Sequence, residues 1–137
     1  MIHTDISGRA MTRIDKGEYM AVYDNELNVK EGLEYAMDSE EFYIEVLQTY
    51  MEETDDELSR MDQFLSDGNM PEYATLVHAV KSGSRLIGAM SLGDEAYDLE
   101  LKSKEGDVEY VRSRHDHLKE HVKAVYDAVN AYMAEKG

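Results

Sequence analysis

Apolar residues recur at alternating steps of three and four along the last thirty residues of the chain, and this period constrains the fold more than any other feature. The stripe consists of Val108, Val111, His115, Leu118, Val122, Val125, Val129 and Tyr132. Because an α-helix turns once every 3.6 residues, this spacing places all eight side chains on one face of a helix. Such a face must be buried, which requires other elements of similar length to pack against it.

Three further segments repeat the pattern. We expect helices from Asp38 or Ser39 to about residue 67, from Pro71 to Ile87, and from Met90 to Ser103, separated by short glycine-containing turns. The apolar face of the first is predicted to comprise Phe42, Val46, Tyr50, Thr54, Leu58, Met61 and Leu65. Four amphipathic helices with short connections bury their faces most simply as an antiparallel up-and-down four-helix bundle, so the predicted fold class is all-α.

The first part of the chain lacks this period. Residues 1–27 are interpreted as an N-terminal arm, with a helical turn expected around Tyr19–Tyr23, and residues 28–137 as the bundle domain. A short helix is predicted over Val29–Ala36, because Asn28 is a favourable N-cap residue.

Charge and composition limit the classes of partner. The net charge is −16, which disfavours nucleic acid and anionic lipid surfaces because both would be repelled. The absence of cysteine excludes disulfides and thiolate chemistry. No apolar run approaches the roughly 20 residues that a membrane-spanning helix needs. We therefore expect a cytoplasmic protein that binds neither membrane nor nucleic acid, and we expect a monomer because no exposed apolar stripe suggests a dimer.

One histidine faces away from the predicted core. With about 100° per residue, Val80 and Ile87 lie opposite His78 on the helix over 71–87. The residues predicted to surround the imidazole on its own face are Ala74, Ser82, Arg85 and Ala89. Since its i−4 and i+4 neighbours are small, a flat partner could approach the ring.

The charge pattern around His78 favours an incoming phosphoryl group. Residues 31–57 hold eleven acids and no base, whereas residues 73–93 hold no acid and two bases, Lys81 and Arg85. Lysine and arginine neutralise phosphoryl oxygens, and a neutral imidazole is a nucleophile at neutral pH. A solvated surface histidine without a role accounts for the helical pattern equally well, and periodicity alone does not separate these two interpretations.

The residues from His78 onward resemble the signature of histidine-containing phosphotransfer (HPt) domains. The matching positions are His78-Ala79-Val80-Lys81-Ser82, then Ser84, Ile87-Gly88-Ala89, Leu92, Ala96 and Leu99-Glu100. Two positions depart from the family pattern. Val80 replaces the usual leucine, and Ser82 replaces the usual glycine and adds a hydroxyl group beside the imidazole.

The resemblance implies a phosphorelay carrier without autokinase activity. His78 would accept a phosphoryl group from the aspartyl phosphate of a receiver domain and pass it to another receiver, with Lys81 near the phosphoryl oxygens. Ala74, Ser82, Arg85 and Ala89 would contact the partner, and the receiver would supply Mg²⁺, so this chain binds no cofactor itself. The alternative is a bundle of the same fold that docks a receiver or another signalling protein without being phosphorylated.

A second histidine pattern is judged to be accidental. Residues 117–121 read H-x-x-E-H, the order found in inverted zinc proteases. Too few residues follow His121 to supply a third ligand and a substrate cleft, and both histidines lie off the apolar stripe. No metal site is predicted.

Overall fold

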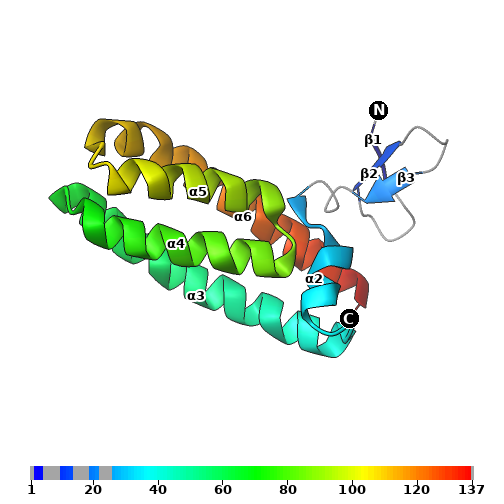
Figure 1. Cartoon of the computed structure of the whole chain (residues 1–137). Helices are drawn as coiled ribbons and strands as arrows, with labels where there is room; N and C mark the ends of the chain where they lie inside the picture. The colour runs from blue at the N-terminus through cyan, green and yellow to red at the C-terminus, as the bar shows by residue number, and fades with distance from the viewer. Residues whose placement is uncertain (1, 5–9, 14–18, 22–25, 137) are drawn as a thin grey trace.

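The structure is a computed structural model that describes residues 2–4, 10–13, 19–21 and 26–136 of the chain. Its helices are α2 (Val29–Tyr35), α3 (Glu40–Asp67), α4 (Met70–Ile87), α5 (Met90–Lys104) and α6 (Val108–Lys136). Helices α3 to α6 are the elongated rods of Figure 1, and each packs against the next, with α6 also packing against α3. This is a ring of four helices around one core, with α2 covering α3 and α4 at one end.

The arm contains strands rather than a helical turn. Strands β1 (Ile2–Thr4), β2 (Ala10–Arg13) and β3 (Tyr19–Ala21) form an antiparallel sheet in the order β1-β2-β3. The helical turn expected around Tyr19–Tyr23 is therefore wrong where the structure describes it, and the all-α class holds only for the helical part. A single isolated turn satisfies few of its backbone groups, whereas strand pairing satisfies them between segments.

Local sequence signals set the helix boundaries. The side chains of Asn28, Ser39 and Asn69 each accept a hydrogen bond from the backbone N–H three residues later, at the N-caps of α2, α3 and α4. Gly68 and Gly88 end α3 and α4 in the left-handed conformation, which glycine adopts at little cost. These boundaries agree with the predicted ones within one or two residues.

The predicted stripe on α6 is confirmed, because all of its members except the half-buried Val108 are buried. The stripe predicted on α3 is wrong in its first two turns. Tyr43 and Leu47 are buried there, whereas Phe42 is exposed and Val46 half-buried. At that end α3 turns Tyr43 toward α4, and its hydroxyl group donates to the carbonyl oxygen of Ile87.

The C-terminal end of α4 is fixed by α2. The backbone N–H of Asn28 donates to the carbonyl oxygen of Gly88 at 2.8 Å, and a Cβ atom on Gly88 would collide with the carbonyl oxygen of Asn28. Helix α4 is thereby held at both ends, since Asn69 caps its start. Among the described residues, no helix is long and apolar enough to cross a lipid bilayer.

Candidate functional site

The site is built on His78, in the middle of α4. Its neighbours Val77 and Val80 are fully buried, whereas 56% of the surface of the histidine side chain is exposed. The outward orientation predicted from the helical period is therefore correct. Helix α4 packs against α3 and α5 on its two sides, so the backbone that carries the ring is rigid.

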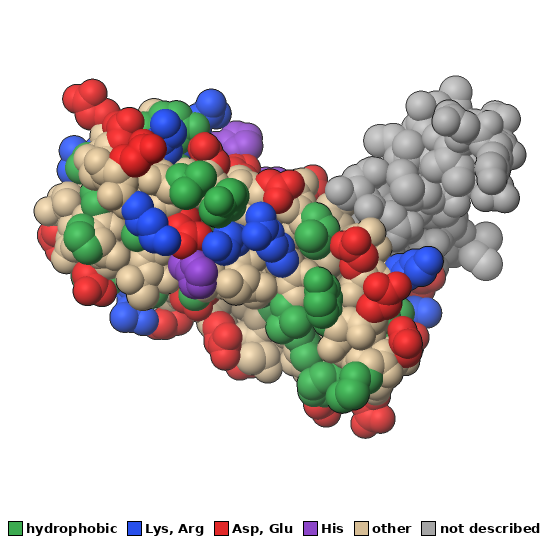
Figure 2. Space-filling model, viewed as in Figure 1, with side chains coloured by type: hydrophobic (Ala, Val, Ile, Leu, Met, Phe, Trp, Pro, Cys, Tyr) green, Lys and Arg blue, Asp and Glu red, His purple; other side chains and the backbone are tan. Residues whose placement is uncertain are grey.

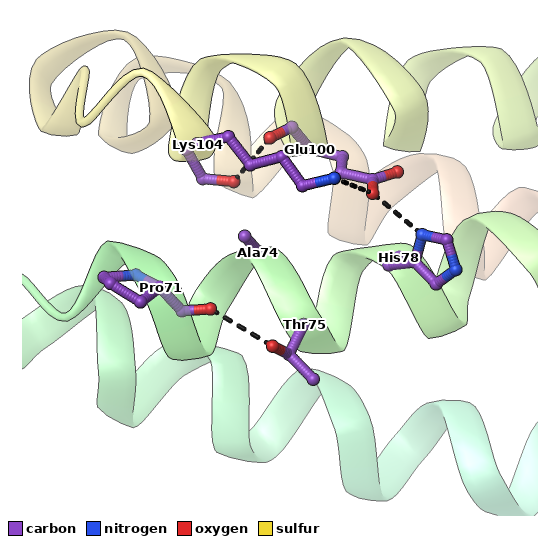
Figure 3. A pocket seen from close by; sticks show the side chains of 7 residues that line it. Pro71, Ala74, Thr75, His78, Glu100 and Lys104 are labelled. Atoms are coloured by element: carbon purple, nitrogen blue, oxygen red, sulfur yellow. Dashed lines mark hydrogen bonds and ion pairs between the residues drawn. The ribbon is translucent and has the colours of Figure 1, made fainter.

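A buried carboxylate from α5 holds the ring. Glu100 is 2% exposed, and its Oε2 lies 2.8 Å from Nδ1 of His78 (Figure 3). The same oxygen accepts a hydrogen bond from Nζ of Lys104 at 2.9 Å, and Oε1 lies 2.7 Å from Nζ of Lys81. One carboxylate thus joins a histidine and two lysines from two helices.

This environment keeps Glu100 ionised. Burial raises the pKa of Glu100, but hydrogen bonds from Lys81, Lys104 and His78 outweigh burial and lower the pKa to about 2. Two ammonium groups around one carboxylate leave the cluster with a net charge of +1 when the imidazole is neutral. Such a cluster is suited to attract an anionic group.

The ionised carboxylate also selects the tautomer of His78. A carboxylate only accepts hydrogen bonds, so Nδ1 must carry the proton that it shares with Glu100. In the neutral ring the lone pair then resides on Nε2. No hydrogen bond to Nε2 occurs within the part of the chain that the structure describes. Nε2 is therefore the ring nitrogen that is left available for an incoming group.

Lys81 lies beside the site, but it is less open to solvent than the sequence suggests. Only 13% of its side chain is exposed, and its ammonium group lies 5.0 Å from the centre of the Tyr97 ring as well as against Glu100. Its predicted contact with phosphoryl oxygens stays a prediction. In the structure Lys81 neutralises the carboxylate that orients the imidazole.

Arg85 is drawn toward α5 instead of standing beside the imidazole. Its guanidinium group pairs with Asp94 at 3.2 Å and lies over the Tyr97 ring, and its aliphatic part packs where a Cβ on Gly93 would lie. Like Lys81 and Lys104, Arg85 pairs with an acidic side chain of α5. Figure 2 shows basic side chains gathered around a histidine on this face of the molecule. Ser82 is exposed, as predicted.

Two of the residues predicted to contact a partner are buried. Ala89 is 0% exposed, because the left-handed backbone at Gly88 ends α4 and the helical period no longer applies to the next residue. Ala74 is 4% exposed and lines a hollow of about 410 Å³ beside His78 (Figure 3). The hollow is bounded by Pro71, Ala74, Thr75, His78, Glu100, Ser103 and Lys104.

Glu100 and Lys104 are site residues that the helical patterns did not predict. A signal for Glu100 exists, since it falls on the same helical face as the buried Leu92, Ala96 and Leu99. An acid on a buried face requires a cation nearby, and Lys81 on the neighbouring helix is the candidate. Lys104 follows one turn later, where it reaches the same carboxylate.

The remaining histidines of the helical region belong to other contacts. His115 is buried between the hydroxyl group of Tyr73 and the carboxylate of Asp62. His117 and His121 each bond Glu95 through Nδ1, and the hydrogen bond and charge of Glu95 raise the pKa of His117. Within the described ranges, no group of three or more histidine, aspartate or glutamate side chains is placed to hold a metal ion.

Comparisons with known proteins identify the family and the fold of this chain. The family model of the Hpt domain matches residues 45–131. The crystal structure of histidine-containing phosphotransfer protein B from Pseudomonas aeruginosa PAO1 is similar to this structure, with a TM-score of 0.74 and 17% sequence identity over 80% of this chain and 96% of that chain. A search of curated proteins gives no match.

A four-helix bundle with an exposed histidine held by a buried carboxylate fits the class of phosphocarrier proteins. Because the family model covers more than half of its length, the chain belongs to the Hpt domain family. Hpt domains carry phosphoryl groups in two-component signalling. The predicted family is therefore confirmed, and the similarity to the solved structure extends to the fold.

Proposed function

We propose that the chain is a monomeric cytoplasmic phosphorelay carrier in which Nε2 of His78 accepts a phosphoryl group from the aspartyl phosphate of one receiver domain and passes it to another. The observation that carries this proposal is the exposed ring whose Nδ1 is held by a buried, ionised carboxylate. Its nucleophilic nitrogen is thereby directed outward without any group of this chain having to move.

The transfer balances without a further reactant. The Nε2 lone pair attacks phosphorus in line with the aspartyl oxygen, a P–N bond forms as the P–O bond breaks, and the aspartate leaves as a carboxylate. The proton on Nδ1 stays on the ring, where Glu100 stabilises the positive charge that develops. Transfer to the second receiver is the same step in reverse.

The roles of the partner and of this chain are complementary. The receiver would supply Mg²⁺ and most of the charge neutralisation, while this chain supplies position and local positive charge. Lys81 and Lys104 share Glu100 with His78, so both ammonium groups add positive charge close to the ring that would carry the phosphoryl group. The exposed Ser82 would border the partner contact, and bulk at this position should hinder docking.

The test is transfer from labelled receivers. Receiver domains from the source organism are purified, phosphorylated with ³²P-acetyl phosphate and mixed with the full chain in Mg²⁺. We expect at least one receiver to place an acid-labile, base-stable label on His78, located by mass spectrometry. A His117→Gln variant, which changes another exposed histidine, should be labelled like the unaltered chain.

Two results would overturn the assignment. Label on His117 or His121 would show that another imidazole is the acceptor. Binding of receivers without any label would favour the alternative function, a docking module of the same fold that is not phosphorylated.

A further inference from the structure

The aromatic ring of Tyr97, on α5, faces two cations of α4. The ammonium nitrogen of Lys81 lies 5.0 Å and the guanidinium carbon of Arg85 5.5 Å from the centre of this ring. Both distances fall within the range of about 6 Å over which the negative face of an aromatic ring attracts a cation. Lys81 and Arg85 are four positions apart on α4, so they lie on one side of that helix and reach the same ring.

Three residues of α5 form the surface that receives these cations. Gly93, Tyr97 and Glu100 follow one another at steps of four and three, so they lie in one line along the helix. A Cβ atom on Gly93 would lie 2.6 Å from Cγ of Arg85, so glycine leaves the space that the arginine stem occupies. At the other end of the line, Oε1 of Glu100 lies 2.7 Å from Nζ of Lys81. Tyr97 therefore stands between the contacts that hold the two cations.

The face of the ring, and not the hydroxyl group, is the part of Tyr97 that makes these contacts. No hydrogen bond to this hydroxyl group occurs among the residues that the structure describes, and 44% of the surface of Tyr97 is exposed. A phenylalanine at this position would therefore keep both cation contacts, whereas an aliphatic side chain would lose them.

Tyr97 and Glu100 together restrict Lys81. A lysine side chain that is free in solvent samples many rotamers, and fixing it during a reaction costs conformational entropy. Only 13% of the Lys81 side chain is exposed, and its ammonium group contacts both the Tyr97 ring and the carboxylate that binds His78. That entropy is therefore lost when the chain folds, and not when a phosphoryl group arrives.

We propose that Tyr97 is a positioning residue for phosphoryl transfer, whose ring holds Lys81 at the carboxylate that binds His78 and keeps Arg85 beside Lys81. Tyr97 acts through the two cations and not on the reacting atoms. The inference rests on the proposed function, because the place of the cations matters to the reaction only if His78 exchanges a phosphoryl group. Positive charge that is fixed in advance stabilises a transition state more than charge that must first be ordered.

The first experiment changes the ring. Tyr97→Phe keeps the aromatic face, and Tyr97→Leu keeps an apolar side chain without that face. His78 is labelled by a receiver and, separately, by phosphoramidate, a small donor that needs no protein contact. We expect both rates to fall about tenfold in Tyr97→Leu and to stay within about twofold in Tyr97→Phe, since only leucine removes two cation–π contacts. A loss in Tyr97→Phe, or a loss in Tyr97→Leu with the receiver alone, would overturn the positioning role.

Tyr110 provides a matched control. Its ring also faces a lysine and an arginine, with Lys102 at 5.2 Å and Arg114 at 5.8 Å from its centre. Tyr110→Leu removes the same kind of contact from residues that do not bond Glu100, and both labelling rates should stay within about twofold. Circular dichroism and urea unfolding check that all three variants fold. A loss in Tyr110→Leu as large as in Tyr97→Leu would be a general effect of removing an aromatic ring and would contradict the inference.

A double-mutant cycle tests whether Tyr97 acts through the cations. In the background Lys81→Met/Arg85→Met, the further change Tyr97→Leu should alter the labelling rates less than about twofold, because no cation is left to position. If Lys81→Met does not fold, Arg85→Met alone serves as the background, and the loss on Tyr97→Leu should shrink to about threefold. An undiminished loss in either background would show that Tyr97 acts independently of the cations.

The outcomes distinguish this inference from the carrier function. If receivers label His78 of the unaltered chain and of Tyr97→Leu at the same rate, Tyr97 has no positioning role and the carrier function stands. If no receiver labels the unaltered chain, the carrier function fails and the positioning role fails with it.

Discussion

His78 and His115 each bond a carboxylate, but the buried partner differs. In one pair the carboxylate is buried, and in the other the imidazole is buried. At His78 the imidazole is 56% exposed and the carboxylate of Glu100 is 3% exposed. At His115 the imidazole is 5% exposed and the carboxylate of Asp62 is 46% exposed. Both pairs join an imidazole to a carboxylate, but only His78 exposes a ring nitrogen to solvent.

The second difference is how many ring nitrogens are used. Nδ1 of His115 lies 2.9 Å from the hydroxyl oxygen of Tyr73, and Nε2 lies 2.6 Å from Oδ1 of Asp62. This ring connects α3, α4 and α6, and both of its nitrogens have a partner. His78 uses Nδ1 alone, so burying the carboxylate instead of the ring leaves one ring nitrogen open to solvent.

The largest effect should come from removing the nucleophile. His78→Gln should abolish labelling by receivers while changing the free energy of unfolding by less than about 1 kcal/mol, because the side chain is exposed. Labelling is followed by autoradiography and stability by urea unfolding. Retained transfer in this variant would contradict the carrier function.

The converse is expected at His115. His115→Ala should lower the free energy of unfolding by about 3 kcal/mol, because it leaves a cavity and the buried hydroxyl group of Tyr73 without its partner. The transfer rate, measured well below the melting temperature, should stay within twofold. His117→Ala on the same helix is the control and should cost less than about 1 kcal/mol. Loss of transfer at unchanged stability would contradict the purely structural role given to His115.

Acid should weaken the His78 cluster selectively. The pKa of Glu100 is about 2 in the folded chain and near 4.5 when unfolded. A lowered pKa contributes stability above the unfolded value, and that stability is lost as the pH falls through the folded value. Between pH 5 and pH 2 the unaltered chain should therefore lose about 2 kcal/mol more than Glu100→Gln. Parallel urea-unfolding curves would contradict the role given to this carboxylate.

Glu100→Gln should also slow transfer. A neutral amide can donate to Nδ1 as well as accept from it, so the preference for the lone pair on Nε2 weakens. By analogy with carboxylates behind metal-bound histidines, we expect a loss of about 10- to 100-fold. The ratio of the two phosphohistidine isomers after phosphoramidate treatment, read by ³¹P NMR, should shift toward Nδ1. An unchanged ratio would show that Glu100 does not set the tautomer.

The smallest effect is expected at Lys104. Its side chain is 61% exposed against 13% for Lys81, although both bond Glu100. Lys104→Met should cost less than about 1 kcal/mol of stability, as exposed ion pairs do, whereas Lys81→Met should cost more because it uncovers a buried carboxylate. Thermal unfolding of the two variants side by side measures this difference. An equal loss of stability in the two variants would show that burial does not determine how much each lysine stabilises the fold.

Much of the fold follows from local signals in the sequence. The caps at Asn28, Ser39 and Asn69 and the unbroken stripe on α6 are readable because each depends on a few neighbouring residues. The start of α3 is less readable, since adjacent apolar residues there allow two stripes and the choice depends on how α4 and α2 pack. The strands of the arm depend on pairing between separate segments, which a helical period does not reveal.

The candidate site likewise has features that can be predicted from a single helix and features that depend on packing between helices. The outward direction of His78 and its nearness to Lys81 follow from one helix and its period. Glu100 lies 22 residues away on another helix, so its contact with the ring exists only once α5 packs on α4. The direction of Arg85 depends on the same packing, through Gly93 and Asp94.

If His78 carries a phosphoryl group, the exposure of its ring would limit how long the chain can hold that group. More than half of its side-chain surface meets bulk water, and no described residue folds over it. Between two encounters a P–N bond at Nε2 would be exposed to hydrolysis, so spontaneous loss competes with delivery. The duration of the stored signal would then depend on how soon the next protein arrives, and a dilute recipient would receive only part of what was loaded.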